Sequence, residues 1–335
     1  MLSLPASSLD KVIRLTRIPW YGFVILVGGA LLLLGLATAF FDGIMDRVLY
    51  EGIWRPLLMA PAIVVYILAV FRPVTDYQER ALNALRRIVR LDDEGFARLV
   101  DKSSKIDGRT EMLAFAVGGT FGFLTNAPWS ISVDLFWLRL YMPLTSTLMF
   151  GLLAWLSYIS LAGTRLFSEL HQEEMNIDIF DLSPFEPIGR YALFSSLAFI
   201  GGSVISVIIL NPLAEGANII SVILYGILAV VTLLVFFLNM RPTHAVLARA
   251  KARELKTAER EIAGTFRDLK GTEAGGADTG AISTRLNLWL RYEERVKKAR
   301  TWPYNTPMLR ALFFSVFVPA IVSIVQRLLG SILAR

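Results

Sequence analysis

Residues Trp20–Phe41 read WYGFVILVGGALLLLGLATAFF, a stretch with no charged side chain. A helix of about 20 apolar residues is long enough to cross the hydrocarbon core of a bilayer. Similar apolar runs recur along the chain at residues 53–71, 112–129, 137–162, 191–210, 219–240 and 312–333. The sequence therefore predicts an all-α, polytopic membrane protein with about seven transmembrane helices.

The composition supports the same fold class. Hydrophobic residues make up 55% of the 335 residues and charged residues 19%, and the mean hydropathy is +0.55. These values lie beyond the balance of a typical soluble chain. The chain has no cysteine, which excludes disulfides, thiolate metal sites and cysteine nucleophiles.

The distribution of lysine and arginine predicts the orientation. Alternate connections, together with Arg310, carry 29 of the 34 basic residues, and cytoplasmic loops are the ones enriched in Lys and Arg. We therefore expect a cytoplasmic N-terminus in the cell membrane, and an external C-terminus if the last segment crosses fully. If that segment only re-enters, the C-terminus returns to the cytoplasm. Signal cleavage after Ala39 is a weaker alternative to an uncleaved first helix.

The predicted organisation alternates membrane pairs with polar connections. Three cytoplasmic connections form a helical base: one with two short helices, an acidic one, and a hairpin with apolar residues every seventh position. The predicted segments are 1–19 (basic, amphipathic), 20–71 (helices 1–2), 72–111 (first connection), 112–162 (helices 3–4), 163–190 (acidic connection), 191–240 (helices 5–6), 241–309 (hairpin) and 310–335 (helix 7).

Catalytic signatures are missing, so the sequence predicts neither an enzyme nor a bound cofactor. His171, Glu174 and Asp178 lie close together in the acidic connection. Imidazole and carboxylate groups bind divalent cations, but no ligand spacing supports a metal site here. A solvated acidic helix is the favoured interpretation of these residues. His244 is likewise expected to be a solvated residue near a helix start.

Two further groups of residues have structural roles in this interpretation. Gly118 and Gly122 have the spacing that lets membrane helices pack closely. Lys297, Lys298 and Arg300 lie near the predicted return to the membrane, where anionic lipid headgroups attract basic side chains. Aromatic residues are not interleaved with this basic charge, so nucleic-acid binding is not predicted.

The leading functional hypothesis is a homo-oligomeric ion channel. Its pore would be lined by the last helix and gated by the cytoplasmic arms, because the hairpin runs directly into that helix. The pore-lining positions would be Pro319, Ser323, Gln326 and Arg327, and a ring of arginines would favour anions. The layout resembles that of insect chemoreceptor-type ligand-gated channels, which implies a tetramer around the last helix. No motif of that family is matched, so no site residue follows from it.

Two other functions remain open. A carrier for a lipid or hydrophobic solute would bind it between the glycine-rich third helix and the fourth. A membrane scaffold or sensor would instead dock a cytoplasmic protein on the hairpin. Exposed apolar seam positions on the hairpin would favour such a partner, and buried ones an internal arm.

Overall fold

The computed structural model describes residues 13, 15–103, 107–125, 135–173, 175–210, 219–272 and 279–333. Within these ranges the chain is helical apart from one isolated β-bridge between Val89 and Met175, which confirms the all-α prediction for them. Seven helices overlap the seven apolar runs: α2 (Trp20–Phe41), α4 (Trp54–Arg86), α6 (Gly108–Thr125), α7 (Phe136–Leu170), α8 (Glu186–Leu210), α9 (Ile219–Thr272) and α11 (Thr306–Leu333). The shorter helices are α3 (Met45–Tyr50), α5 (Asp93–Ser103) and α10 (Thr279–Lys298).

Among the described residues, four helical segments are long and apolar enough to cross a membrane: α2, α4, α7 and Ser183–Ile209, which contains most of α8. Large apolar side chains on the outside of the bundle fit this assignment, since Ile25 of α2 is 74% and Leu144 of α7 is 56% exposed. The apolar helices thus indicate a membrane protein. Seven spans and the N-in, C-out topology stay predictions. Helix α6 has Arg109 and Glu111 in its first turn, and α11 counts as a shorter apolar helix, Thr306–Val318.

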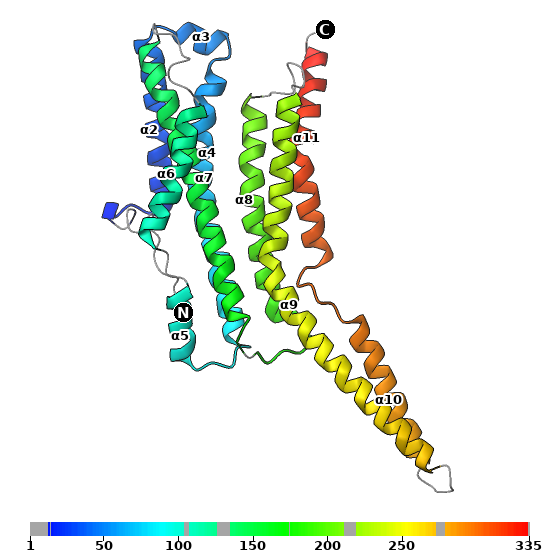
Figure 1. Ribbon diagram of the computed structural model, residues 1–335. Coiled ribbons are helices and arrows are strands. Elements are labelled where there is room, and N and C mark those ends of the chain that lie inside the picture. The colour runs from blue at the N-terminus through cyan, green and yellow to red at the C-terminus, as the bar shows by residue number, and fades with distance from the viewer. Residues whose placement is uncertain are drawn as a thin grey trace.

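The helices form two groups that lie side by side (Figure 1). Helices α2, α4, α6 and α7 pack together, and α8, α9 and α11 form the second group. Helix α4 joins the two groups because it packs against α7 and also against α8. At that junction Phe71 and Trp155 are buried, with ring centroids 4.8 Å apart.

Helix α9 is a single helix of 54 residues. Its second half and α10 form a two-helix arm, residues 241–272 and 279–298, which projects from the bundle in Figure 1. The described part of the predicted hairpin thus consists of two helices that pack together, and the first of them continues from Ile219 without a break. Its seam is buried between the two helices, because Leu255 and Ile262 are half-buried and Val296 is fully buried. By the criterion set above, this seam favours an internal arm.

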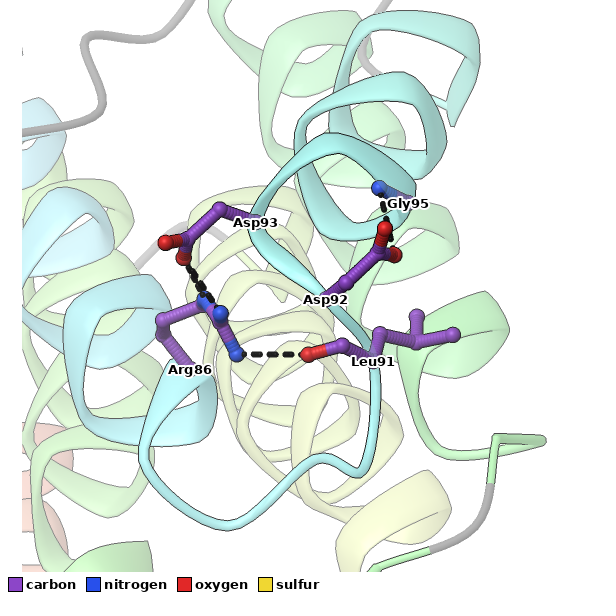
Figure 2. A network of polar contacts seen from close by, with 5 residues as sticks. All are labelled: Arg86, Leu91, Asp92, Asp93 and Gly95. Carbon is purple, nitrogen blue, oxygen red and sulfur yellow. Dashed lines mark hydrogen bonds and ion pairs between the residues drawn. The ribbon is translucent and has the colours of Figure 1, made fainter.

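The turn from α4 into α5 is held by one arginine (Figure 2). The Nη1 group of Arg86 donates to the Leu91 carbonyl at 3.0 Å, and the guanidinium pairs with Asp93. The Oδ1 atom of Asp92 accepts a hydrogen bond from the Gly95 backbone N–H at 3.0 Å. This is helix N-capping, and it fixes the start of α5 at Asp93.

Candidate functional site: a groove at the base of the arm

A groove of about 690 Å³ lies where the arm meets the bundle. Its walls come from the end of the first connection, the start of the acidic connection and the near part of the arm. The lining residues are Arg90, His171, Gln172, Glu173, Met175, Asn176, Ile177, Val246, Arg249, Ala250, Ala252, Arg253 and Glu254. Segments far apart in the sequence thus converge on one site.

Two contacts fix the acidic connection to the first connection beside this groove. Val89 and Met175 form the β-bridge, and the Asn176 backbone N–H donates to the Ile88 carbonyl at 2.8 Å. Ser103 of α5 also hydrogen-bonds Glu169 at the end of α7. These contacts between the two connections use backbone and hydroxyl donors.

Arg249 and Arg253 present their guanidinium groups on the α9 side of the groove. They lie four residues apart and therefore share one face of the helix. Both side chains are exposed, and neither pairs with a carboxylate in the described part of the chain. The Nε group of Arg249 donates only to its own helix, at the Ala245 carbonyl, 3.3 Å away. Glu254 is already engaged, because it accepts a hydrogen bond from the Tyr292 hydroxyl at 3.0 Å.

His171 is buried at the edge of the groove, with 4% of its surface exposed. Its Nδ1 atom contacts the Phe167 carbonyl, and its Nε2 atom has no hydrogen-bond partner among the residues described. The pKa of His171 is lowered to about 4, mainly by burial and to a smaller extent by the nearby charge of Arg249, while the hydrogen bond to the Phe167 carbonyl opposes this shift. The imidazole is therefore neutral at pH 7. The expectation of a solvated side chain is wrong, because α9 and the acidic connection cover this helix end.

The structure does not assemble a metal site from the predicted ligands. Glu174 lies outside the described residues. Asp178 does not line the groove with His171, and its carboxylate accepts a hydrogen bond from the Phe180 backbone N–H at 2.8 Å. Over the described ranges, no group of three or more His, Asp or Glu side chains could hold a metal ion.

A polar seam between α7 and α9 leads from the bundle toward the groove. Thr164 hydrogen-bonds to the side-chain oxygen of Asn239. Asn239 Nδ2 and Thr243 Oγ1 are buried and have no partner in the part of the chain that is described. Unpaired buried polar atoms cost about 1–3 kcal/mol each. Neither residue lines the groove, so these atoms are a feature of the buried contact between α7 and α9.

A small apolar latch holds the arm against the acidic connection. Ile179 is buried with Ala250 and Val296 of the arm. Next to it, the Arg295 guanidinium lies 4.4 Å from the centre of the Phe180 ring, and the Tyr292 ring contacts the same phenylalanine at 5.9 Å. This latch, which comprises Ile179 and Phe180 with their arm contacts, is much smaller than the cores of the bundle.

The linker between α10 and α11 is clamped to α9. Trp302 stacks on His244 with ring centroids 4.0 Å apart and an interplanar angle of 10°. The His244 Nδ1 atom lies 3.1 Å from the Thr301 carbonyl. Lys251 donates to the carbonyls of Lys297 and Ala299 at 2.6 and 2.8 Å. The prediction of a solvated His244 near a helix start is wrong, since α9 passes through it without a break.

The basic residues assigned to lipid headgroups lie at this end of α10. Lys297 and Lys298 pair within α10 with Glu293 and Glu294, at 2.7 and 2.6 Å. Arg300 is exposed just beyond the helix. Contact with headgroups remains a prediction for these three residues.

The predicted pore-lining positions all fall within α11, but their side chains lie outside the described part. Their positions, Pro319, Ser323, Gln326 and Arg327, follow Leu312 by 7, 11, 14 and 15 residues. Nearer the start of the helix, Leu312 is buried against Ala192, Phe236 and Met240 of α8 and α9. The pore-lining role of the four positions stays a prediction.

The glycines of α6 bring it against the backbone of α7. A Cβ atom at Gly118 would lie 2.3 Å from the Phe150 carbonyl oxygen, and one at Gly122 equally close to that of Ser146. Both separations are far below van der Waals contact. These helices therefore leave no space beside the two glycines, where a carrier was expected to hold its solute.

Sequence reasoning missed Arg249 and Arg253 as site residues. On a long basic helix they look like any other solvated arginine, and only their three-dimensional neighbours distinguish them. Comparison of the chain with protein-family models, with curated proteins and with solved structures gives no match.

Proposed function

We propose that this chain is a non-enzymatic, multi-pass protein of the cell membrane that senses a cytoplasmic ligand through its arm. The apolar helices support membrane insertion, and the excess of Lys and Arg at the arm end supports a cytoplasmic arm. Lipid surrounds the exposed apolar side chains of the bundle. The sensing part is the groove at the base of the arm.

The observation that carries this proposal is the connection of the arm to two membrane segments. One side of the arm is α9 itself, which runs without interruption from Ile219 to Thr272. The other side leads into α11 through the linker that Trp302 and His244 clamp. Near its base the arm is anchored by Leu247, which is buried in the bundle core with Phe185, and further along the small latch ties it to the acidic connection. A ligand in the groove would therefore change the position of the arm, and the arm would carry the change to α11.

The test measures the arm and α11 separately. The chain has no cysteine, so Lys102→Cys and Ala263→Cys can carry two spin labels in lipid nanodiscs. Breaking the latch with Phe180→Ala should shift or broaden their distance distribution. Phe266→Ala, which alters an exposed phenylalanine of the arm, is the matched control.

A second label reports on α11. An environment-sensitive fluorophore at Phe314→Cys, a position 69% exposed, should change its emission when Phe180→Ala is added. Arm movement without any change at α11 would contradict transmission. An unchanged arm distance in Phe180→Ala would contradict the latch.

A homo-oligomeric channel is the second candidate function. It is favoured by an apolar stripe on the exposed side of α11, formed by Phe313, Phe317, Ile321 and Val325. These residues recur every fourth position and offer a continuous face to a second copy or to lipid. Native mass spectrometry in nanodiscs should show a closed oligomer of three or more subunits. A monomer would contradict the channel, and unchanged ion selectivity in Arg327→Glu would contradict a pore lined by that residue.

A further inference from the structure

We infer that the groove at the base of the arm binds a phosphate group that carries a neighbouring hydroxyl, held by Arg249 and Arg253. This inference names the ligand class of the proposed sensor, and it rests on that proposal for the cytoplasmic location of the groove. The argument uses the charge of the lining, the spacing of the two guanidinium groups and the neutral histidine.

The charge of the groove favours an anion. Its lining holds three arginines, Arg90, Arg249 and Arg253, and two carboxylates, Glu173 and Glu254. Arg90 has an interaction of its own, and Glu254 accepts the Tyr292 hydroxyl. The lining therefore holds three guanidinium groups against two carboxylates. This excess of positive charge favours an anion beside the two exposed arginines of α9.

The spacing of the guanidinium groups suits phosphate. Arg249 and Arg253 are separated by one helical turn, a rise of about 6 Å along α9. Each guanidinium is a planar donor that binds phosphate oxygens in pairs. Two of them on one helix face can therefore bind different oxygens of a single phosphate. The groove, at about 690 Å³, also has room for a substituent on that phosphate.

The histidine adds a requirement for a donor. Its Nδ1 atom contacts the Phe167 carbonyl, which is satisfied when Nδ1 carries the proton. In a neutral imidazole the other nitrogen is then an acceptor. That acceptor, Nε2, is unpaired in the described structure and has almost no exposed surface. The ring lines the groove, so a small shift of the surrounding side chains would have to open Nε2 to a ligand. A hydroxyl group of the ligand would supply the missing hydrogen-bond donor. A phosphate ester that carries a hydroxyl can place this donor at Nε2 better than inorganic phosphate can.

Such a group has two sources, a free solute and a lipid headgroup. Arg249 lies eight residues beyond Arg241, the first residue after the predicted sixth span, which is about 12 Å along the helix. A polar headgroup layer extends about 5–8 Å beyond the hydrocarbon core. A free phosphate ester would enter the groove from the cytoplasm. A lipid headgroup would enter it if the arm leaned far enough toward the membrane to bring the groove to the headgroup layer.

The experiment titrates the full chain, purified in a zwitterionic detergent, by isothermal calorimetry with inorganic phosphate and with glycerol 3-phosphate. A parallel arm uses native mass spectrometry of nanodiscs made from phosphatidylcholine with and without phosphatidylglycerol. The test variant is Arg249→Gln with Arg253→Gln. The matched control is Arg267→Gln, because Arg267 is an exposed arginine of the same helix whose Nε group also donates to its own backbone, at 3.4 Å.

The expected result is binding of glycerol 3-phosphate, weaker binding of inorganic phosphate, and at least a tenfold loss of affinity in the double variant but not in Arg267→Gln. Glu173→Gln removes the opposing carboxylate and should tighten binding several-fold, a gain that misfolding cannot produce. Retention of phosphatidylglycerol alone, lost in the double variant, would assign the same chemistry to a headgroup. Equal affinity in wild type and double variant, or no binding in either arm, would overturn the inference.

The failure of this inference and that of the proposed function are distinguishable. Ligand binding is read by calorimetry, and arm movement by the distance between labels at positions 102 and 263. Binding without a change in that distance would leave the phosphate site in place and contradict the sensor. If the distance changed in Phe180→Ala but no phosphate bound, the latch and the movable arm would stand and the phosphate site would be contradicted.

Discussion

Replacing a glycine by alanine should lower the stability of the fold at Gly118, in the contact between α6 and α7, and raise it at Gly202 in α8. Gly118→Ala places a methyl group 2.3 Å from the Phe150 carbonyl oxygen and 2.5 Å from the Ala154 Cβ atom. Both neighbours are rigid, so the helices must separate, and overpacking of this kind costs about 1–3 kcal/mol. Gly202→Ala in α8 meets no atom within 4 Å. Alanine is the better helix former by up to about 1 kcal/mol, so this variant should be more stable than wild type.

The assay is thermal unfolding of both variants and wild type in the same detergent, followed by tryptophan fluorescence. Gly118→Ala should unfold below wild type and Gly202→Ala above it, with about 1–3 kcal/mol between the two variants, because the gain in helix propensity is common to both. Size-exclusion chromatography at the starting temperature checks that both are folded. If Gly118→Ala were as stable as Gly202→Ala, the close approach of the α6 and α7 backbones would be refuted.

Three further predictions concern the arm end of the bundle. The pKa of His171 is about 4 in the folded chain and about 6.5 in the unfolded chain. As the pH falls, the unfolded state therefore binds a proton first. The free energy of unfolding should decrease between pH 6.5 and pH 4, by up to about 3 kcal/mol. Denaturation in urea at pH 7 and pH 5 measures this loss, and His171→Asn should reduce it. Trp302→Leu removes the ring stacked on His244 and should cost about 1 kcal/mol in thermal unfolding, whereas an unchanged midpoint would contradict the clamp. Arg86→Gln removes the hydrogen bond to the Leu91 carbonyl and a largely exposed ion pair. We therefore expect a loss of about 1 kcal/mol in stability and faster proteolytic cleavage in α5. A cleavage rate equal to that of wild type would contradict this role of Arg86.

The membrane helices are predictable because each is encoded locally. Trp20–Phe41 is bounded by the residues the sequence predicts, and each of the seven apolar runs overlaps a described helix. The ends of the long helices are less predictable. Hydrophobicity stops near Phe71 in α4 and near Ala162 in α7, yet both helices continue through polar residues. Membrane thickness sets where the apolar run ends, but capping and packing set where the helix ends.

The groove could not be predicted, because its residues carry no local signal of their surroundings. His171 is followed by an acidic stretch, which is typical of a solvated segment, and it is buried only because α9 crosses it. Arg253 is surrounded in sequence by charged and apolar residues, as many solvated arginines of amphipathic helices are, so its sequence does not mark it as a site residue.

The unbroken course of α9 also has a mechanical consequence. From Arg241 to Thr272 the helix extends for about 48 Å, at 1.5 Å per residue. A rod of that length, pivoting at the membrane surface, multiplies small rotations: a tilt of about 5° at its base moves its tip by about 4 Å. The groove lies close to the pivot, between Val246 and Glu254. A sub-ångström adjustment around a ligand there becomes a displacement of several ångströms at the far end, without any change in the fold of the helix itself.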